Sequence, residues 1–90
     1  MSKVFGKEPS MNLYKMILEL KDLDECYRFF QDLCTVSELR AMEQRFDVAV
    51  LLQKGMIYNE ILEQTGASSA TISRVNRALN YGVEGYHQVF

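Results

Sequence analysis

The chain has 90 residues, of which 48% are hydrophobic and 24% are charged, and its formal net charge is −2. This length allows one domain without a second core, and the hydrophobic fraction excludes an intrinsically disordered chain. The weak negative charge excludes a generally basic nucleic-acid-binding protein, so any binding to nucleic acid must depend on a local patch.

A chain this short buries only about 60–65% of its unfolded surface, which favours association with a second subunit. No stretch is apolar over the length of a membrane span, and the first residues lack the apolar core of a signal peptide. We therefore expect a soluble, cytoplasmic protein without contact to a membrane. No strand-like alternation of polar and apolar residues occurs, so the predicted fold class is all-α.

The first elements in chain order are an arm and two helices. Residues 1–9 contain two lysines, a glycine and the only proline, and they predict a loose arm. Ser10 can cap a helix that extends to Leu20, with apolar residues at i, i+3, i+4 and i+7. A second helix is predicted over Asp24 to Leu33, apolar on so much of its circumference that it requires neighbours on two sides. The two cysteines of this apolar stretch, Cys26 and Cys34, lie eight residues apart and cannot be bridged along one helix, so we interpret them as buried free thiols.

The third helix has the clearest start in the chain. Thr35 to Glu38 (TVSE) form a capping box, with Thr35 as N-cap and Glu38 bonded back to its amide. The helix is predicted to continue to Lys54 and to end at Gly55. The predicted inner face consists of Leu39, Met42, Phe46, Ala49, Val50 and Leu52.

Two short helices around a tight turn follow, in the segment from Asn59 to Asn80. The first helix stops at Gly66, where a residue without Cβ can adopt the left-handed conformation. The second opens at Ser68 or Ser69 and has an apolar face of Ile72, Val75 and Leu79. This arrangement predicts a helix-turn-helix over residues 57–80, preceded by dimerisation helices over 10–55 and followed by a tail over 81–90, whose two glycines argue against a full stable helix.

The polar face of that second helix carries no acidic residue, unlike an ordinary solvated helix face. Small residues at its start allow close approach to base edges, serine and asparagine can hydrogen-bond there, and arginine can bind phosphate or guanine. The candidate DNA-binding residues are Ser68, Ser69, Ala70, Ser73, Arg74, Arg77, Asn59 and Lys54. For Arg74 the alternative is a surface salt bridge within a dimer, such as one to a glutamate of the third helix.

Catalysis has little support in this sequence. It contains neither a glycine-rich phosphate loop nor a cluster of His, Cys and carboxylate residues at metal-ligand spacing. The single histidine, His87, is interpreted as a surface residue. We therefore predict that the protein is not an enzyme and that it requires no metal or cofactor.

The segment from Leu33 to Leu79 resembles the Trp repressor family, and within it the small Trp-repressor-like proteins of Gram-positive bacteria. Three blocks carry the resemblance in the same order and spacing: LCTVSELRAMEQR, LLQKGM and TGASSATISR. The resemblance implies an intertwined homodimer whose helix-turn-helix heads bind a palindromic double-stranded DNA operator. The predicted function is thus that of a sequence-specific, DNA-binding transcriptional regulator, and more narrowly of a repressor. The alternative is a protein–protein interaction module that keeps the fold without DNA binding, which the negative net charge favours.

The resemblance also implies a candidate effector pocket. Arg45 and Arg74 match the two arginines between which family members hold L-tryptophan, and Thr71 matches a further pocket residue. Where the tryptophan binders have glycine after the second arginine, this chain has Val75, whose branched side chain is expected to obstruct the indole. We therefore expect DNA binding either without a corepressor or with a different, smaller effector than L-tryptophan.

Overall fold

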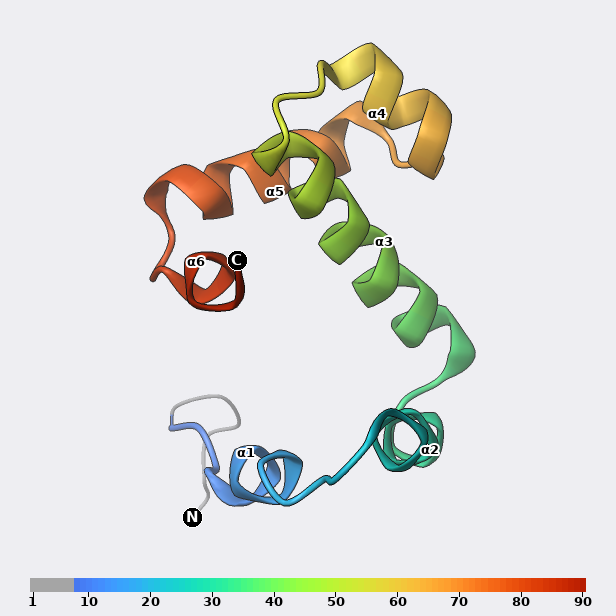
Figure 1. The fold of residues 1–90 in the computed structure, drawn as a ribbon, viewed down its shortest axis with the longest axis vertical. Helices are drawn as coiled ribbons and strands as arrows, with labels where there is room; N and C mark the ends of the chain where they lie inside the picture. Colours follow the sequence, from blue (N-terminus) through green and yellow to red (C-terminus); the bar gives the residue numbers. More distant parts are fainter. Residues whose placement is uncertain (1–7) are drawn as a thin grey trace. The chain divides into compact units, whose positions relative to one another are not determined.

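A computed structural model describes residues 8–90, which fall into two compact units, up to Thr35 and from Val36 onward. The first unit contains α1 (Asn12–Ile17) and α2 (Leu23–Leu33). The second contains α3 (Val36–Gln53), α4 (Tyr58–Thr65), α5 (Ser69–Tyr81) and α6 (Gly85–Val89). The described residues form helices and no strands, which confirms the all-α class (Figure 1). The predicted arm lies mostly outside the described part, which begins at residue 8.

The first helix is shorter than the sequence predicts. Its N-cap is Met11 rather than Ser10, although the Ser10 hydroxyl accepts a hydrogen bond from the Asn12 amide at 3.4 Å. The helix ends at Ile17, and the next turns are tighter, because the amides of Glu19 and Leu20 bond to carbonyls three residues back. Short helices depend on packing for stability, and α1 contains no buried residue.

The second helix begins one residue earlier than predicted. Asp22 is its N-cap, and the Asp22 carboxylate accepts a hydrogen bond of 2.8 Å from the Glu25 amide. The Glu25 side chain in turn accepts a hydrogen bond of 3.0 Å from the Lys21 amide. Two backbone amides at the start of the helix are therefore satisfied by side chains. The cysteines at positions 26 and 34 are free, as predicted, but they are half-buried rather than buried.

The third helix begins directly after Thr35 and ends at Gln53, close to the predicted bounds. Its buried residues are Leu39, Val48 and Ala49, so the predicted inner face is partly wrong. Met42 and Phe46 are 37% and 45% exposed, whereas Val48 was not predicted and is fully buried. The helix is apolar on more than one side, so residue periodicity alone does not identify the side that α4 and α5 cover.

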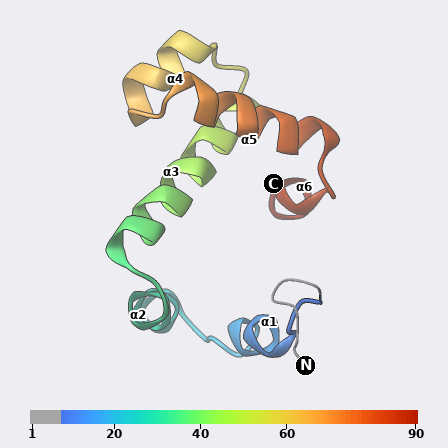
Figure 2. The same ribbon diagram turned by 180° about the vertical axis from the view of Figure 1, so that it is seen from behind.

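The hydrophobic core of the second unit joins α3, α4 and α5. Figure 2 shows α4 and α5 packed at the carboxyl-terminal end of α3, with α5 crossing it. The buried residues are Val48, Ala49, Ile61, Ala67, Ile72, Val75 and Leu79. The predicted apolar face of α5 is thereby confirmed, since Ile72, Val75 and Leu79 are at most 8% exposed.

The tail forms a short helix, which the sequence did not predict. Glu84 precedes α6 in the left-handed region with φ of 68°, and α6 spans five residues. His87 lies against the end of α5, with its Nε2 atom 2.8 Å from the Leu79 carbonyl oxygen. The Tyr86 and Phe90 rings stack with their centroids 6.1 Å apart. The tail is therefore held to α5 by a hydrogen bond and by packing around Tyr86.

Candidate nucleic-acid interface and adjoining hollow

The turn between α4 and α5 has the predicted geometry. Gly66 ends α4 with φ of 73°, and its amide donates to the Leu62 carbonyl at 2.9 Å. Ser68 is the N-cap of α5, and its hydroxyl accepts a hydrogen bond of 3.1 Å from the Thr71 amide. Between these two, Ala67 is 1% exposed and anchors the turn in the core. The two helices and their turn therefore form a helix-turn-helix built on α3.

One face of α5 remains accessible along the helix. The exposed residues on this recognition face are Ser69, Ala70, Ser73, Arg74 and Arg77. They lie opposite the buried residues of the same helix, and α5 contains no acidic residue. Small side chains at the start of the helix and arginines further on give a surface that can approach a groove of DNA closely and neutralise phosphate.

The remaining predicted contact residues lie outside this face. Ser68 is exposed, but its hydroxyl already caps α5 and lies 3.1 Å from the Thr71 hydroxyl. Asn59 is exposed in the first turn of α4, and Lys54 is exposed just after the end of α3. These three positions are accessible from solvent, and none belongs to the recognition face of α5.

The arginines of the chain divide into paired and unpaired groups. Arg28 pairs with Asp24 at 2.9 Å, and Arg40 pairs with Glu43 at 2.6 Å. Within residues 8–90, Arg45, Arg74 and Arg77 form no salt bridge. Within residues 8–90 of the single chain, Arg74 forms no ion pair with a glutamate of α3, and such a pair across a dimer stays the alternative for this residue. Unpaired guanidinium groups keep their full capacity to bind an external anion.

A hollow adjoins the amino-terminal half of α5. Its volume is about 350 Å³, and it is lined by Ala41, Gln44, Arg45, Thr71 and Arg74. The structure thus brings together three predicted pocket residues, Arg45, Thr71 and Arg74, from α3 and α5. The sequence reasoning missed Ala41 and Gln44. Ala41 lies four residues before Arg45 and so shares its side of the helix, which was a readable signal, whereas Gln44 is the direct neighbour of Arg45 and its spacing gave no such signal.

Val75 does not belong to this hollow, contrary to the sequence-based expectation. Its side chain is 2% exposed and packs in the core with Val48 and Ile72. Successive residues of a helix point about 100° apart, so the neighbour of an exposed arginine can face the core. The expectation that Val75 obstructs an indole beside Arg74 stays a prediction, which binding of L-tryptophan would test.

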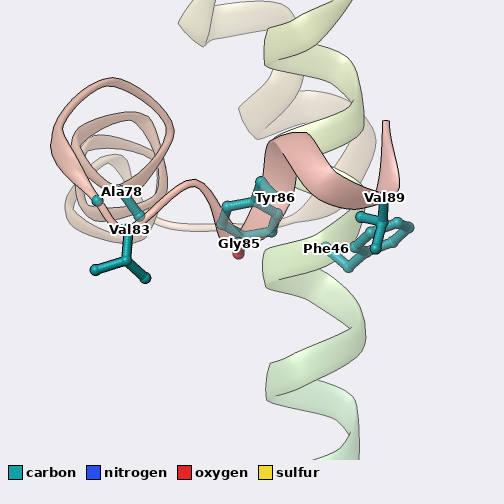
Figure 3. A pocket seen from close by; sticks show the side chains of 7 residues that line it. Phe46, Ala78, Val83, Gly85, Tyr86 and Val89 are labelled. Atoms are coloured by element: carbon teal, nitrogen blue, oxygen red, sulfur yellow. The ribbon is translucent and has the colours of Figure 1, made fainter.

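A second, apolar groove lies between α3, α5 and α6, and Figure 3 shows Phe46 of α3 near Val89 of α6 at its edge. Its volume is about 600 Å³, and it is lined mostly by apolar groups.

Among residues 8–90 there is neither a cluster of potential metal ligands nor a helix long and apolar enough to cross a membrane.

Comparison with known proteins gives consistent matches. The family model described as Trp repressor protein matches residues 10–90. An uncharacterised protein of Bacillus subtilis (strain 168), YerC, is 55% identical over 84 residues, which cover 93% of this chain and 80% of YerC.

Two solved structures share the fold. A TrpR-like protein from Eubacterium eligens ATCC 27750 is 58% identical with a TM-score of 0.84, over 87% of this chain and 80% of that one. A candidate Trp repressor from Staphylococcus aureus is 45% identical with a TM-score of 0.83, over 86% of this chain and 77% of that one.

Proposed function

This chain belongs to the Trp repressor family, and we propose that it is a sequence-specific, DNA-binding transcriptional regulator that acts as a homodimer. In this proposal, the recognition face of α5 enters the major groove of an operator. Ser69, Ala70 and Ser73 approach base edges, while Arg74 and Arg77 bind phosphate. Lys54 and Asn59 add contacts to the DNA backbone from the neighbouring helix ends.

The observation that carries this proposal is the combination of exposure and unpaired charge on α5. Arg74 and Arg77 are exposed, form no salt bridge within residues 8–90, and have no acidic residue in their own helix. The only acidic residues of α4 are Glu60 and Glu63, so the helix-turn-helix has no net charge and its positive charge is confined to α5. A local patch of this kind suffices for phosphate contacts in a chain of net charge −2.

The homodimer is supported by apolar surface that the single chain leaves uncovered. Neither α1 nor α2 contains a buried residue, although both are rich in large apolar side chains. Soluble proteins seldom leave so much apolar surface in water, and a second copy of the chain supplies matching apolar helices. Two copies related by a two-fold axis also present two α5 helices, as a palindromic operator requires.

The hollow beside α5 supports a further part of the proposal, a small anionic effector. Arg45 and Arg74 both line it without a carboxylate partner among the described residues. Two guanidinium groups at one hollow favour a carboxylate or phosphate group there. Because Arg74 also belongs to the recognition face, a bound anion changes the charge that this face presents to DNA.

Selection of bound duplexes from a random-sequence pool tests the proposed function. The purified wild-type protein should enrich a palindromic sequence with half-sites about 10 base pairs apart from centre to centre. The Arg77→Ala variant should enrich the same sequence less strongly. The rival function, a protein–protein interaction module without DNA binding, is favoured by the acidic residues of α4. Absence of any enriched sequence would support that rival and reject DNA recognition.

A further inference from the structure

Two uncharged polar side chains line the hollow, Gln44 and Thr71, and both are hydrogen-bonded to the turn between α4 and α5. The Gln44 amide nitrogen donates to the Thr65 carbonyl oxygen at 3.1 Å. Thr71 is linked to Ser68 twice, because its amide donates to the Ser68 hydroxyl and the two hydroxyl oxygens lie 3.1 Å apart. The wall of the hollow and the turn are therefore connected through specific side chains.

The bond from Gln44 differs from the others because it joins distant parts of the chain. Gln44 lies on α3, 21 residues before Thr65, whereas the bonds between Ser68 and Thr71 span three residues. Thr65 is the last residue of α4, where a helix carbonyl lacks a donor from its own helix. Gln44 supplies that donor from the long helix on which the helix-turn-helix is built.

The turn that receives this bond has a defined internal structure. The Thr65 hydroxyl donates to the Ile61 carbonyl at 2.7 Å and accepts a hydrogen bond of 3.1 Å from the Ala67 amide. Both Gln44 and Thr65 are half-buried, so water competes for their hydrogen bond less than it would on an exposed surface. Loss of the Gln44 amide leaves the Thr65 carbonyl without this donor, at the point where the chain leaves α4 toward α5.

We propose that Gln44 is a positioning residue for α5. Its side-chain amide fixes the turn between α4 and α5 to α3, and thereby holds the recognition face in the orientation that binds DNA. The effect on DNA rests on the proposed function, whereas the effect on the turn can be measured without DNA. Since Gln44 also lines the hollow, the residue that orients α5 is accessible to a ligand bound there.

The test uses Gln44→Met, which keeps a similar volume and cannot donate a hydrogen bond. Gln44→Glu is a second variant of nearly the same shape, whose ionised carboxylate would also face the Thr65 carbonyl as a second acceptor. Gln53→Met is the matched control, because Gln53 is an exposed residue at the end of the same helix.

Two quantities are measured for each full-length variant. The first is amide hydrogen exchange at Gly66 and Ala67, compared with exchange at Val48 and Ala49 in the core of α3. The second is the affinity for the best selected duplex and for a scrambled duplex. We expect Gln44→Met to accelerate exchange in the turn by about threefold to tenfold and to weaken specific binding by a similar factor. Exchange in α3 and binding to the scrambled duplex should change little, and Gln53→Met should match the wild type.

Each other outcome has a definite meaning. Unchanged exchange in the turn of Gln44→Met would overturn the proposal, and equal acceleration in the turn and in α3 would overturn it in favour of general destabilisation. Faster exchange in the turn with unaltered specific affinity would show that the hydrogen bond from Gln44 to Thr65 does not orient α5 for DNA. That result would also overturn the proposal. If the wild type binds no duplex, the proposed function fails, while the exchange data still decide whether Gln44 holds the turn. Should Gln44→Met fail to fold, Gln44→Glu provides the same comparison.

Discussion

The two units of this chain differ in how they use apolar residues. Residues 36–90 enclose a core in which Val48, Ile61 and Ile72 are fully buried. Among residues 8–35, no residue is buried, and Leu18 and Leu23 are each 84% exposed. Apolar content alone therefore does not make a core. The second unit folds its helices onto one another within one chain, while the first leaves its apolar helices exposed in the single chain, where the proposed homodimer would cover them.

The largest effect is expected in the core of the second unit. Ile72→Ala removes a fully buried side chain that joins α5 to α3 and α4, and it should lower the free energy of unfolding by about 2–5 kcal/mol. Urea denaturation measures this change. Ser73→Ala, at the exposed neighbouring position, should stay within about 0.5 kcal/mol of the wild type. Similar losses for both variants would contradict the packing described here.

A substitution in the first unit tests whether its exposed apolar residues are covered by a second copy of the chain. Leu33 ends α2 and is 50% exposed in the single chain, so a monomer should tolerate Leu33→Ala with little loss. If a second copy covers α2, the variant should lose about 2 kcal/mol, and its unfolding midpoint should depend on protein concentration. Gln31→Ala, an exposed change in the same helix, is the control. A loss for Leu33→Ala no larger than for this control would show that α2 faces water.

DNA binding is expected to respond to smaller changes on α5. Arg77→Ala should weaken binding to all duplexes by about tenfold and reduce the salt dependence by about one unit of slope per half-site. Ser73→Ala should instead relax the base preference with a smaller loss of affinity. Fluorescence anisotropy at several salt concentrations separates the two effects. Arg28→Ala, which removes an arginine already paired with Asp24, should leave binding unchanged.

The smallest effect concerns the backbone of the turn. Gly66 has φ of 73° and an open space where a Cβ would lie, so Gly66→Ala should cost about 1 kcal/mol through backbone strain alone. Gly85→Ala also meets no neighbouring atom, and Gly85 has no positive φ. The Gly85→Ala control should therefore leave the stability unchanged or raise it slightly. The thermal unfolding midpoints of the two variants are compared, and equal midpoints would argue against strain at Gly66.

Local signals in the sequence predicted much of this fold. Ser68 and Gly66 marked the turn correctly, because a cap and a left-handed glycine act within a few residues. The periodic residues Ile72, Val75 and Leu79 marked the buried face of α5. The predicted end of the first helix was wrong, because α1 ends at Ile17. The length of a short helix without buried residues depends on its packing rather than on its own periodicity. The short helix α6 was missed for a related reason, because the Leu79 carbonyl that holds His87 belongs to another helix.

The candidate site shows the same division between local and distant contacts. The spacing of α5 predicted which residues are exposed, but Arg45 could be brought to Arg74 only by the packing of α3 on α5. The resemblance to the family supplied that pair of arginines, while the helical spacing of Ile72, Val75 and Leu79 had already placed Val75 on the core side of α5. Gln44 could not have been singled out from the sequence, because its partner lies 21 residues away.

Sedimentation of the wild-type protein, alone and with its best selected duplex, tests the central claim most directly. The free protein should sediment as a dimer at micromolar concentration and dissociate only when it unfolds. With a palindromic duplex, the complex should contain two chains and one DNA molecule. A stable folded monomer, or a complex of one chain with one duplex, would contradict the account.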